Sequence, residues 1–371
     1  MRKRFLAAAV AALAVVPASA QTPAAAPVSA ARPAQAPAAK PAAAKWATPK
    51  TPWGHPDLSG TWTSDGAIGI PMARPDQFAG RVELTEAEFA DKLKRDAATR
   101  QRSDTTCGAF CNDNTWLKKS FNQTSLVIDG DGKIPPLTPQ AEARRAPRDR
   151  GTFGDGPFEH TTDFTNYDRC ITRGIVGSIL PVVYGNGNRI LQTPNEVVIS
   201  YEMVHDTRII PLDGRAHVGS RIRQYMGDSR GRWEGDTLVV ETSNLTDRTS
   251  IGLNGNGLRH SAEMKMVERF TRKANDELQY EVRIEDPNTY TRPFTIRVPL
   301  ISPPGFQLLP YECHEGNYML AAVLGGERAE DKAWADDLAK GVIRPRKAVQ
   351  FNERAAPAGT AGSEEGPPPA R

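Results

Sequence analysis

Apolar and polar residues alternate along much of the second half of the chain, a pattern typical of strands buried on one face. From Glu277 to Glu285 every second residue is apolar. Side chains two residues apart on a strand point to the same side of a sheet. One buried face is therefore expected to carry these four residues: Leu278, Tyr280, Val282 and Ile284.

Turn residues between such segments predict two hairpins. The segment Met264–Phe270 is followed by the polar break Lys273–Asp276 and then by the strand at 277–285. Within Arg232–Glu241, the three residues Glu234-Gly235-Asp236 supply the turn chemistry of a second hairpin. Both hairpins indicate antiparallel pairing between strands that are neighbours in sequence.

The remaining apolar segments extend this pattern to a mainly β, antiparallel meander. Further strands are expected at about 189–193, 196–204, 207–212, 221–226, 292–300 and 306–313. Such a meander closes into a lipocalin-like barrel or forms a curved sheet. A few flanking helices are expected at about 85–101, from 138 onward and at 327–339, the first opened by a capping box of Thr85 and Glu88.

Composition divides the chain into four parts. Residues 1–20 combine Arg2, Lys3 and Arg4 with an apolar run and the small residues Ala18-Ser19-Ala20, which is typical of a signal peptide. Residues 21–50 are rich in Ala and Pro and predict a disordered tether. A single mainly β domain is expected at 51–354, followed by a disordered tail at 355–371.

Charge and motifs narrow the range of functions. The formal net charge of +3 is spread over interleaved acidic and basic residues, which disfavours nucleic-acid binding. No apolar run is long enough to span a membrane, and a periplasmic or secreted location is expected. The sequence has no P-loop, dinucleotide fingerprint or Gly-x-Ser-x-Gly elbow.

Four cysteines suggest disulfides in an oxidising compartment. Cys107 and Cys111 can close a small loop, which leaves Cys170 and Cys313 as a long-range pair, although three pairings are open. We predict the Cys170–Cys313 disulfide. A thioredoxin-like redox site and a zinc site are disfavoured, because the required Cys spacings are missing.

Acidic, basic and histidine side chains gather where predicted strands end. Glu202, His205 and Arg208 flank one such junction, where His205 would be a general acid or base oriented by Glu202, and Arg208 would hold a polar or anionic substrate. His314 and Glu315 follow another predicted strand and complete the catalytic candidates. Exposed turn residues are the alternative interpretation of both groups.

Three further residues are candidates for substrate binding: Arg215, His217 and Asn317. A metal site built from His205, His217, His314 and Glu315 is chemically feasible, but the spacing of these residues does not match a metal motif. We therefore predict neither a metal nor a cofactor.

Several longer motifs carry a resemblance. Pro56–Trp62, Met226–Asp236, Ile284–Pro293 and Tyr311–Asn317, together with the 202–208 and 213–217 segments, look like a widespread family of exported bacterial proteins known only as hypothetical proteins. The resemblance covers most of 53–330, except about 94–122, and implies no activity. Separately, Leu58–Trp62 resembles the Gly-x-Trp signature of the first strand of lipocalin-like barrels.

Three functions follow as hypotheses. The first is a cofactor-independent lyase or hydrolase, with acid–base residues in a β-barrel pocket acting on a small organic or sugar-derived molecule. The second is a lipocalin-like binding module for a small amphipathic ligand. The third is an envelope interaction protein without a pocket, supported only by the tether. The oligomeric state is left open.

Overall fold

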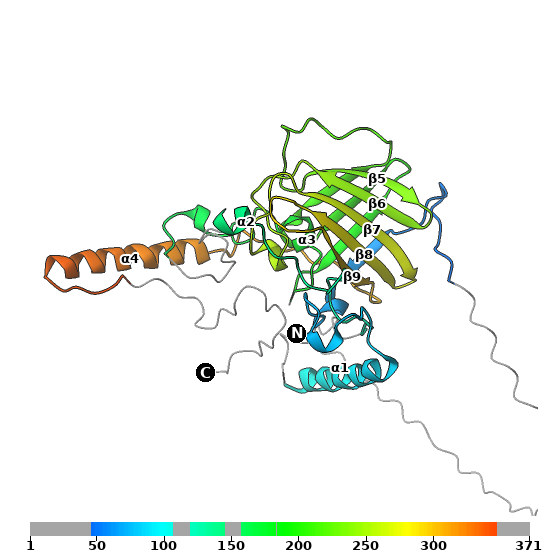
Figure 1. The fold of residues 1–371 in the computed structure, drawn as a ribbon, viewed down its shortest axis with the longest axis horizontal. Helices are drawn as coiled ribbons and strands as arrows, with labels where there is room; N and C mark the ends of the chain where they lie inside the picture. The colour runs from blue at the N-terminus through cyan, green and yellow to red at the C-terminus, as the bar shows by residue number, and fades with distance from the viewer. Residues whose placement is uncertain (1–45, 107–118, 145–156, 183, 347–371) are drawn as a thin grey trace, which may run out of the picture. The chain divides into compact units, whose positions relative to one another are not determined.

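The fold is a single antiparallel β-sheet with nine strands (Figure 1). The computed structural model describes residues 46–106, 119–144, 157–182 and 184–346. The strands are β1 (Gly60–Thr63), β2 (Gly187–Gln192), β3 (Glu196–Tyr201), β4 (Thr207–Pro211), β5 (Asp228–Glu234), β6 (Thr237–Ser243), β7 (Lys265–Ala274), β8 (Glu277–Glu285) and β9 (Phe294–Ile301). Their order in the sheet is β4-β3-β2-β1-β9-β8-β7-β6-β5.

Both predicted hairpins are confirmed. β5 and β6 pair from Asp228↔Ser243 to Glu234↔Thr237, so Gly235 and Asp236 form the turn. β7 pairs with β8 along nearly its whole length. The predicted buried face of β8 is also present, with all four side chains at most 1% exposed: Leu278, Tyr280, Val282 and Ile284.

Of the two expected alternatives, a barrel or a curved sheet, the barrel does not form, because β4 and β5 are the edges of the sheet and do not pair with each other. The two edge strands do come into contact: a Cβ on Gly231 of β5 would lie 2.8 Å from the Ile210 side chain of β4. A weak junction lies in the middle of the sheet, where β1 pairs with β9 only at Thr63↔Ile301. The sheet is therefore open, with β4 at one end and β5 at the other.

Two predicted strands do not form. In 221–226 the structure has only an isolated bridge between Gln224 and Leu245, because Asn244, with φ +58°, directs its side-chain amide at the carbonyl of Ile222. The segment 306–313 is irregular. Three prolines in or before it, Pro303, Pro304 and Pro310, lack the N–H that a strand ladder needs.

The helices are α1 (Glu86–Thr106), α2 (Pro139–Arg144), α3 (Gly174–Gly177) and α4 (Met319–Ala339). The capping box that opens α1 is present, since the Glu88 carboxylate accepts the Thr85 N–H at 2.8 Å and Thr85 Oγ1 accepts the Glu88 N–H at 3.3 Å. α4 begins eight residues earlier than predicted because its first turns bury apolar residues against Phe158 and Phe164.

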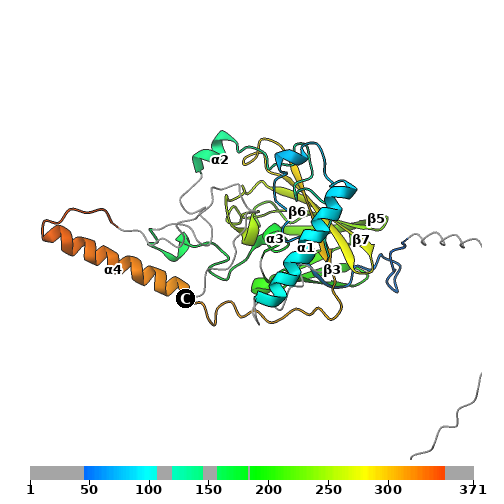
Figure 2. The ribbon, with the colours of Figure 1, turned by 90° about the horizontal axis from the view of Figure 1, so that it is seen from below.

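The core is one large buried cluster of strand residues and the residues packed against them. Ile175 and Val176 of α3 belong to the same buried cluster as the strand residues, which packs α3 against the sheet (Figure 2). Trp62, the residue of the lipocalin-like signature, is 1% exposed and donates its indole N–H to the Leu58 carbonyl at 2.9 Å. The Arg272 guanidinium lies 5.3 Å from the centre of its ring. These contacts make Trp62 a core residue.

The last residues of the expected tether contact the domain: Lys50 bridges to Pro56 and forms an ion pair with Asp236 at 2.5 Å. The signal peptide, the rest of the tether, the tail, Cys107 and Cys111 lie outside the described residues. In the described part of the chain, no helix has the length and apolar character that crossing a bilayer requires.

Candidate functional site

The predicted trio of Glu202, His205 and Arg208 is not brought together. Within the described chain, no hydrogen bond or ion pair joins any two of these side chains. β3 ends at Tyr201, and a tight turn follows with positive φ at both Val204 and His205. This turn leaves His205 exposed, whereas Arg208 re-enters the sheet on its buried face.

Arg208 is part of a buried ion pair. Its guanidinium contacts both carboxylate oxygens of Glu268 on β7, at 2.8 and 3.2 Å. The Tyr280 hydroxyl donates to the same carboxylate at 3.1 Å. Burial by itself lowers the pKa of Arg208, but the charge and hydrogen bonds of Glu268, together with Tyr201 and Tyr280, outweigh burial and raise the pKa above its ordinary value. Arg208 thus links β4 to β7 through the core.

Glu202 is bound to the backbone. Its carboxylate accepts the Gly187 N–H at 3.0 Å and the Leu309 N–H at 3.2 Å. The side chain therefore ties the start of β2 to the irregular segment after β9, an arrangement that satisfies both carboxylate oxygens.

The three predicted substrate-binding residues lie apart. Arg215 is exposed and pairs with its near neighbour Asp213 at 2.5 Å. His217 Nδ1 lies 2.9 Å from the Asp228 carboxylate, on the edge strand β5. Asn317 donates to the Asp168 carbonyl at 2.8 Å, so its amide supports the backbone of a loop.

Asp228 gives the fold a pH dependence. Burial raises the pKa of Asp228, but hydrogen bonds from the Val218 N–H and His217, and the charge of Arg230, outweigh burial and lower it below 3.8. A carboxyl group with a lowered pKa stabilises the folded state above its unfolded pKa, and this stabilisation is lost as pH falls below 3.8 through the folded pKa. We therefore expect low pH to destabilise the wild-type protein more than it destabilises the Asp228→Asn variant.

Urea unfolding of the two proteins between pH 7 and pH 3 measures this difference. The wild type is expected to lose about 1 kcal/mol more of its free energy of unfolding than the variant over this range. Equal losses in both proteins would contradict the role of Asp228.

The predicted disulfide between Cys170 and Cys313 is present, with a Cα–Cα distance of 5.7 Å. It is consistent with an oxidising compartment. His314 and Glu315 follow Cys313 and are both exposed. The disulfide joins their segment to the loop at 165–173, which carries two arginines that the sequence analysis did not select, Arg169 and Arg173.

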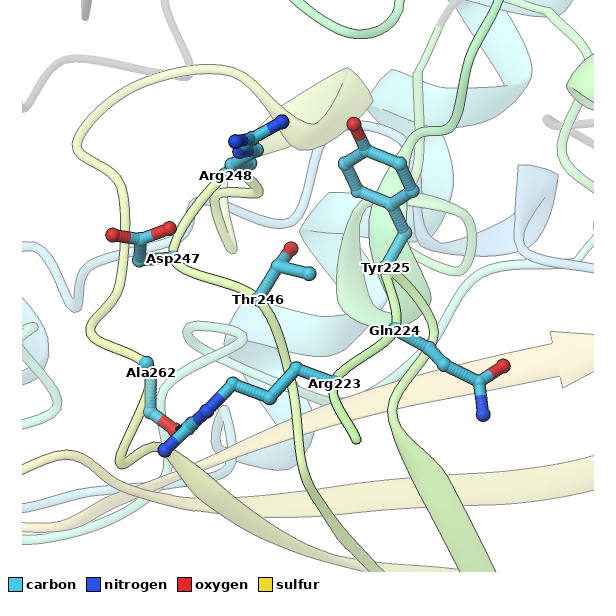
Figure 3. A pocket seen from close by; sticks show the side chains of 7 residues that line it. All are labelled: Arg223, Gln224, Tyr225, Thr246, Asp247, Arg248 and Ala262. Atoms are coloured by element: carbon cyan, nitrogen blue, oxygen red, sulfur yellow. Dashed lines mark hydrogen bonds between the residues drawn. The ribbon is translucent and has the colours of Figure 1, made fainter. Parts of the chain in front are cut away.

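An open pocket of about 420 Å³ lies where three loops meet (Figure 3). Its lining comes from 223–225, 246–248 and Ala262. The Tyr225 ring and the Arg248 side chain rise on the same side of Thr246, and Arg223 runs below it toward Ala262. Within the described ranges, the buried Thr246 hydroxyl oxygen has no hydrogen-bond partner.

Positive charge gathers at this pocket. Arg248 is exposed, and Asn166 holds its backbone by donating to the Arg248 carbonyl at 2.7 Å. The same Asn166 accepts from Arg169 Nη2 at 2.5 Å. Burial lowers the pKa of Arg169, and the neighbouring charges of Arg259 and Arg248 lower it further. Guanidinium groups that repel one another beside an open pocket form a favourable place for an anion.

The pocket lining has two other charged residues, Arg223 and Asp247. Arg223 pairs with Glu263 at 2.8 Å and donates to the Leu245 carbonyl at 3.3 Å, so its charge is partly engaged. Asp247 points away from Tyr225, on the far side of Thr246. Arg248 is therefore the pocket cation best placed to meet a ligand.

Metal ligation has no support in the structure that is described: among those residues, no three His, Cys, Asp or Glu side chains are grouped closely enough to hold an ion. Sequence reasoning passed over Arg248 in the pocket and Arg169 near it because both lie in irregular segments with no periodicity. The only local signal was the concentration of arginine at 221–223 and 248 beside polar turn residues.

The resemblance to exported bacterial proteins stays a prediction. Neither a family model nor a curated protein matches this chain.

Proposed function

We propose that the protein binds a small anionic molecule in the pocket between Tyr225, Thr246 and Arg248. The carrying observation is that the exposed Arg248 lines an open pocket of about 420 Å³. Behind it, Asn166 joins the Arg248 carbonyl to a second guanidinium group, that of Arg169. Like charges held this close are costly unless an anion compensates them. A carboxylate or phosphate group accepts the hydrogen bonds that a guanidinium donates.

The remaining lining fits the rest of such a ligand. The Thr246 hydroxyl is a donor and acceptor whose oxygen has no partner within the described residues, and it lies between the Tyr225 ring and the Arg248 side chain. Tyr225 offers an aromatic face with a polar end. The pocket volume suits a metabolite-sized molecule.

A binding role is favoured over acid–base catalysis. The carboxylate of Glu202 is occupied by two backbone N–H groups, and Arg208 is buried with Glu268. The lyase or hydrolase hypothesis stays a prediction that rests on the exposed His205, His314 and Glu315. With the predicted signal peptide and the disulfide, the proposal becomes an exported binding protein for a small anion, in the periplasm or outside the cell.

Isothermal titration with citrate, succinate and inorganic phosphate tests the proposal. We expect at least one of these anions to bind the wild type, and Arg248→Gln to weaken that binding about 10-fold or more, because a charge-assisted hydrogen bond is lost. Affinity should also fall as salt is added, since Arg248 is exposed.

Arg232→Gln is the matched control. Arg232 is equally exposed, lies on β5 and pairs with Glu241 and Glu234 away from the pocket. Binding in this variant should equal that of the wild type. Absence of binding for all three anions, or equal weakening in both variants, would rule out the pocket as the anion site.

A further inference from the structure

Outside the pocket, another arginine is buried, and among the residues that the structure describes it has no carboxylate partner. Arg173 is 1% exposed and directly precedes α3. Its Nη1 donates to the Gly185 carbonyl at 2.9 Å, which fixes the plane of the guanidinium group. Within the described part of the chain, the other two nitrogens, Nε and Nη2, have no hydrogen-bond partner.

Aromatic side chains surround this guanidinium group. Its Cζ lies 5.7 Å from the centre of the Tyr167 ring. The Tyr167 hydroxyl lies 3.5 Å from that of Tyr184, which is 56% exposed. The electrostatic neighbours of Arg173 are Tyr167, Tyr184, Tyr311 and Glu202.

None of these neighbours neutralises the charge by a direct contact. The Glu202 carboxylate is held by the N–H groups of Gly187 and Leu309. Burial lowers the pKa of Arg173 to about 10, which still leaves it protonated at neutral pH. A buried charge with two unpaired donors is costly, and an anion would remove that cost.

The free edge of the guanidinium group defines the chemistry of that anion. Nε and Nη2 point their N–H groups in parallel, and a carboxylate accepts both at once. We propose that Arg173 binds the carboxylate of a small aromatic acid, whose ring lies beside the phenol rings of Tyr167 and Tyr184.

This site is separate from the anion pocket, whose lining does not include Arg173. The two sites differ in what they accept. The pocket is open and its cation Arg248 is exposed, so it favours hydrophilic anions. The Arg173 site is buried and walled by aromatic rings, so it favours an acid with an apolar, planar body.

Titration with 4-hydroxybenzoate, 4-hydroxybenzamide and cyclohexanecarboxylate tests the proposal. The benzoate should bind, the uncharged amide should bind at least 10-fold more weakly, and the non-aromatic acid should lie in between. Equal binding of the benzoate and the amide, or no binding of the benzoate at millimolar concentration, would overturn the proposal.

Variants locate the binding. Arg173→Lys should weaken benzoate binding 10-fold or more, because a single ammonium cannot replace the two parallel donors. Tyr184→Ala removes an exposed ring, so it should fold and bind the benzoate several-fold more weakly. Arg232→Gln, the exposed control, should leave benzoate affinity unchanged. A loss in Arg248→Gln with none in Tyr184→Ala would place the acid in the pocket and refute the Arg173 site.

Discussion

Glu268→Gln is expected to lower the free energy of unfolding by about 3 to 5 kcal/mol. The side chains of Arg208 and Glu268 are only 2% and 0% exposed, so the variant leaves a buried guanidinium charge without its counter-ion. The glutamine keeps the size of the side chain, which separates the charge effect from a cavity effect. Urea unfolding at neutral pH measures the change.

Two further variants test whether the lost stability comes from the buried ion pair. Glu281→Gln breaks a partly exposed pair with Arg297 on neighbouring strands, and it should cost about 1 kcal/mol or less. The double change Arg208→Met with Glu268→Leu removes both charges and should recover most of the stability lost in Glu268→Gln. If Glu268→Gln costs no more than Glu281→Gln, the buried pair does not have the assigned role.

Replacing both disulfide cysteines, Cys170→Ser with Cys313→Ser, is expected to cost about 4 to 5 kcal/mol. The disulfide spans a sequence separation of 143 residues, and so large a loop restricts the unfolded chain strongly. Urea unfolding of oxidised wild type and of the double variant gives the difference.

Reduction of the wild type supplies the control for this second result. Under dithiothreitol the wild type should approach the stability of the equally reduced double variant. The double variant itself should change only by the small contribution of a Cys107–Cys111 loop. A difference below about 1 kcal/mol between oxidised wild type and variant would mean that strain in the folded protein offsets the loop restriction.

The sequence predicted the local part of the fold well. The alternating residues of β8 and the turn at Gly235 depend on neighbours in sequence, and both hairpins formed as expected. Closure of the sheet depends on contacts between distant segments. Neither the single pair Thr63↔Ile301 nor the missing pairing between β4 and β5 has a local signature, so the sequence left a barrel and a curved sheet as alternatives.

The candidate site was harder to predict for the same reason. β4 has only five residues. This is too few for the alternation of side chains to show that Arg208 points to the same buried side of the sheet as Ile210. The sequence around β7 did contain a signal for the buried carboxylate. Glu268 stands at every-second-residue spacing with three buried residues: Met264, Met266 and Phe270. Arg169, Arg173 and Arg248 lie outside any strand, and only the folded loops bring them to their sites.

The narrow junction between β1 and β9 has a consequence for the rate at which the chain folds. Strands β5 to β9 each pair with a strand next to them in sequence, so this half can assemble by closing short loops. β1 must instead meet β2 and β9, which lie more than a hundred and more than two hundred residues away along the chain. Docking of this four-residue strand is thus the slow, entropically demanding step that unites the two halves of the sheet.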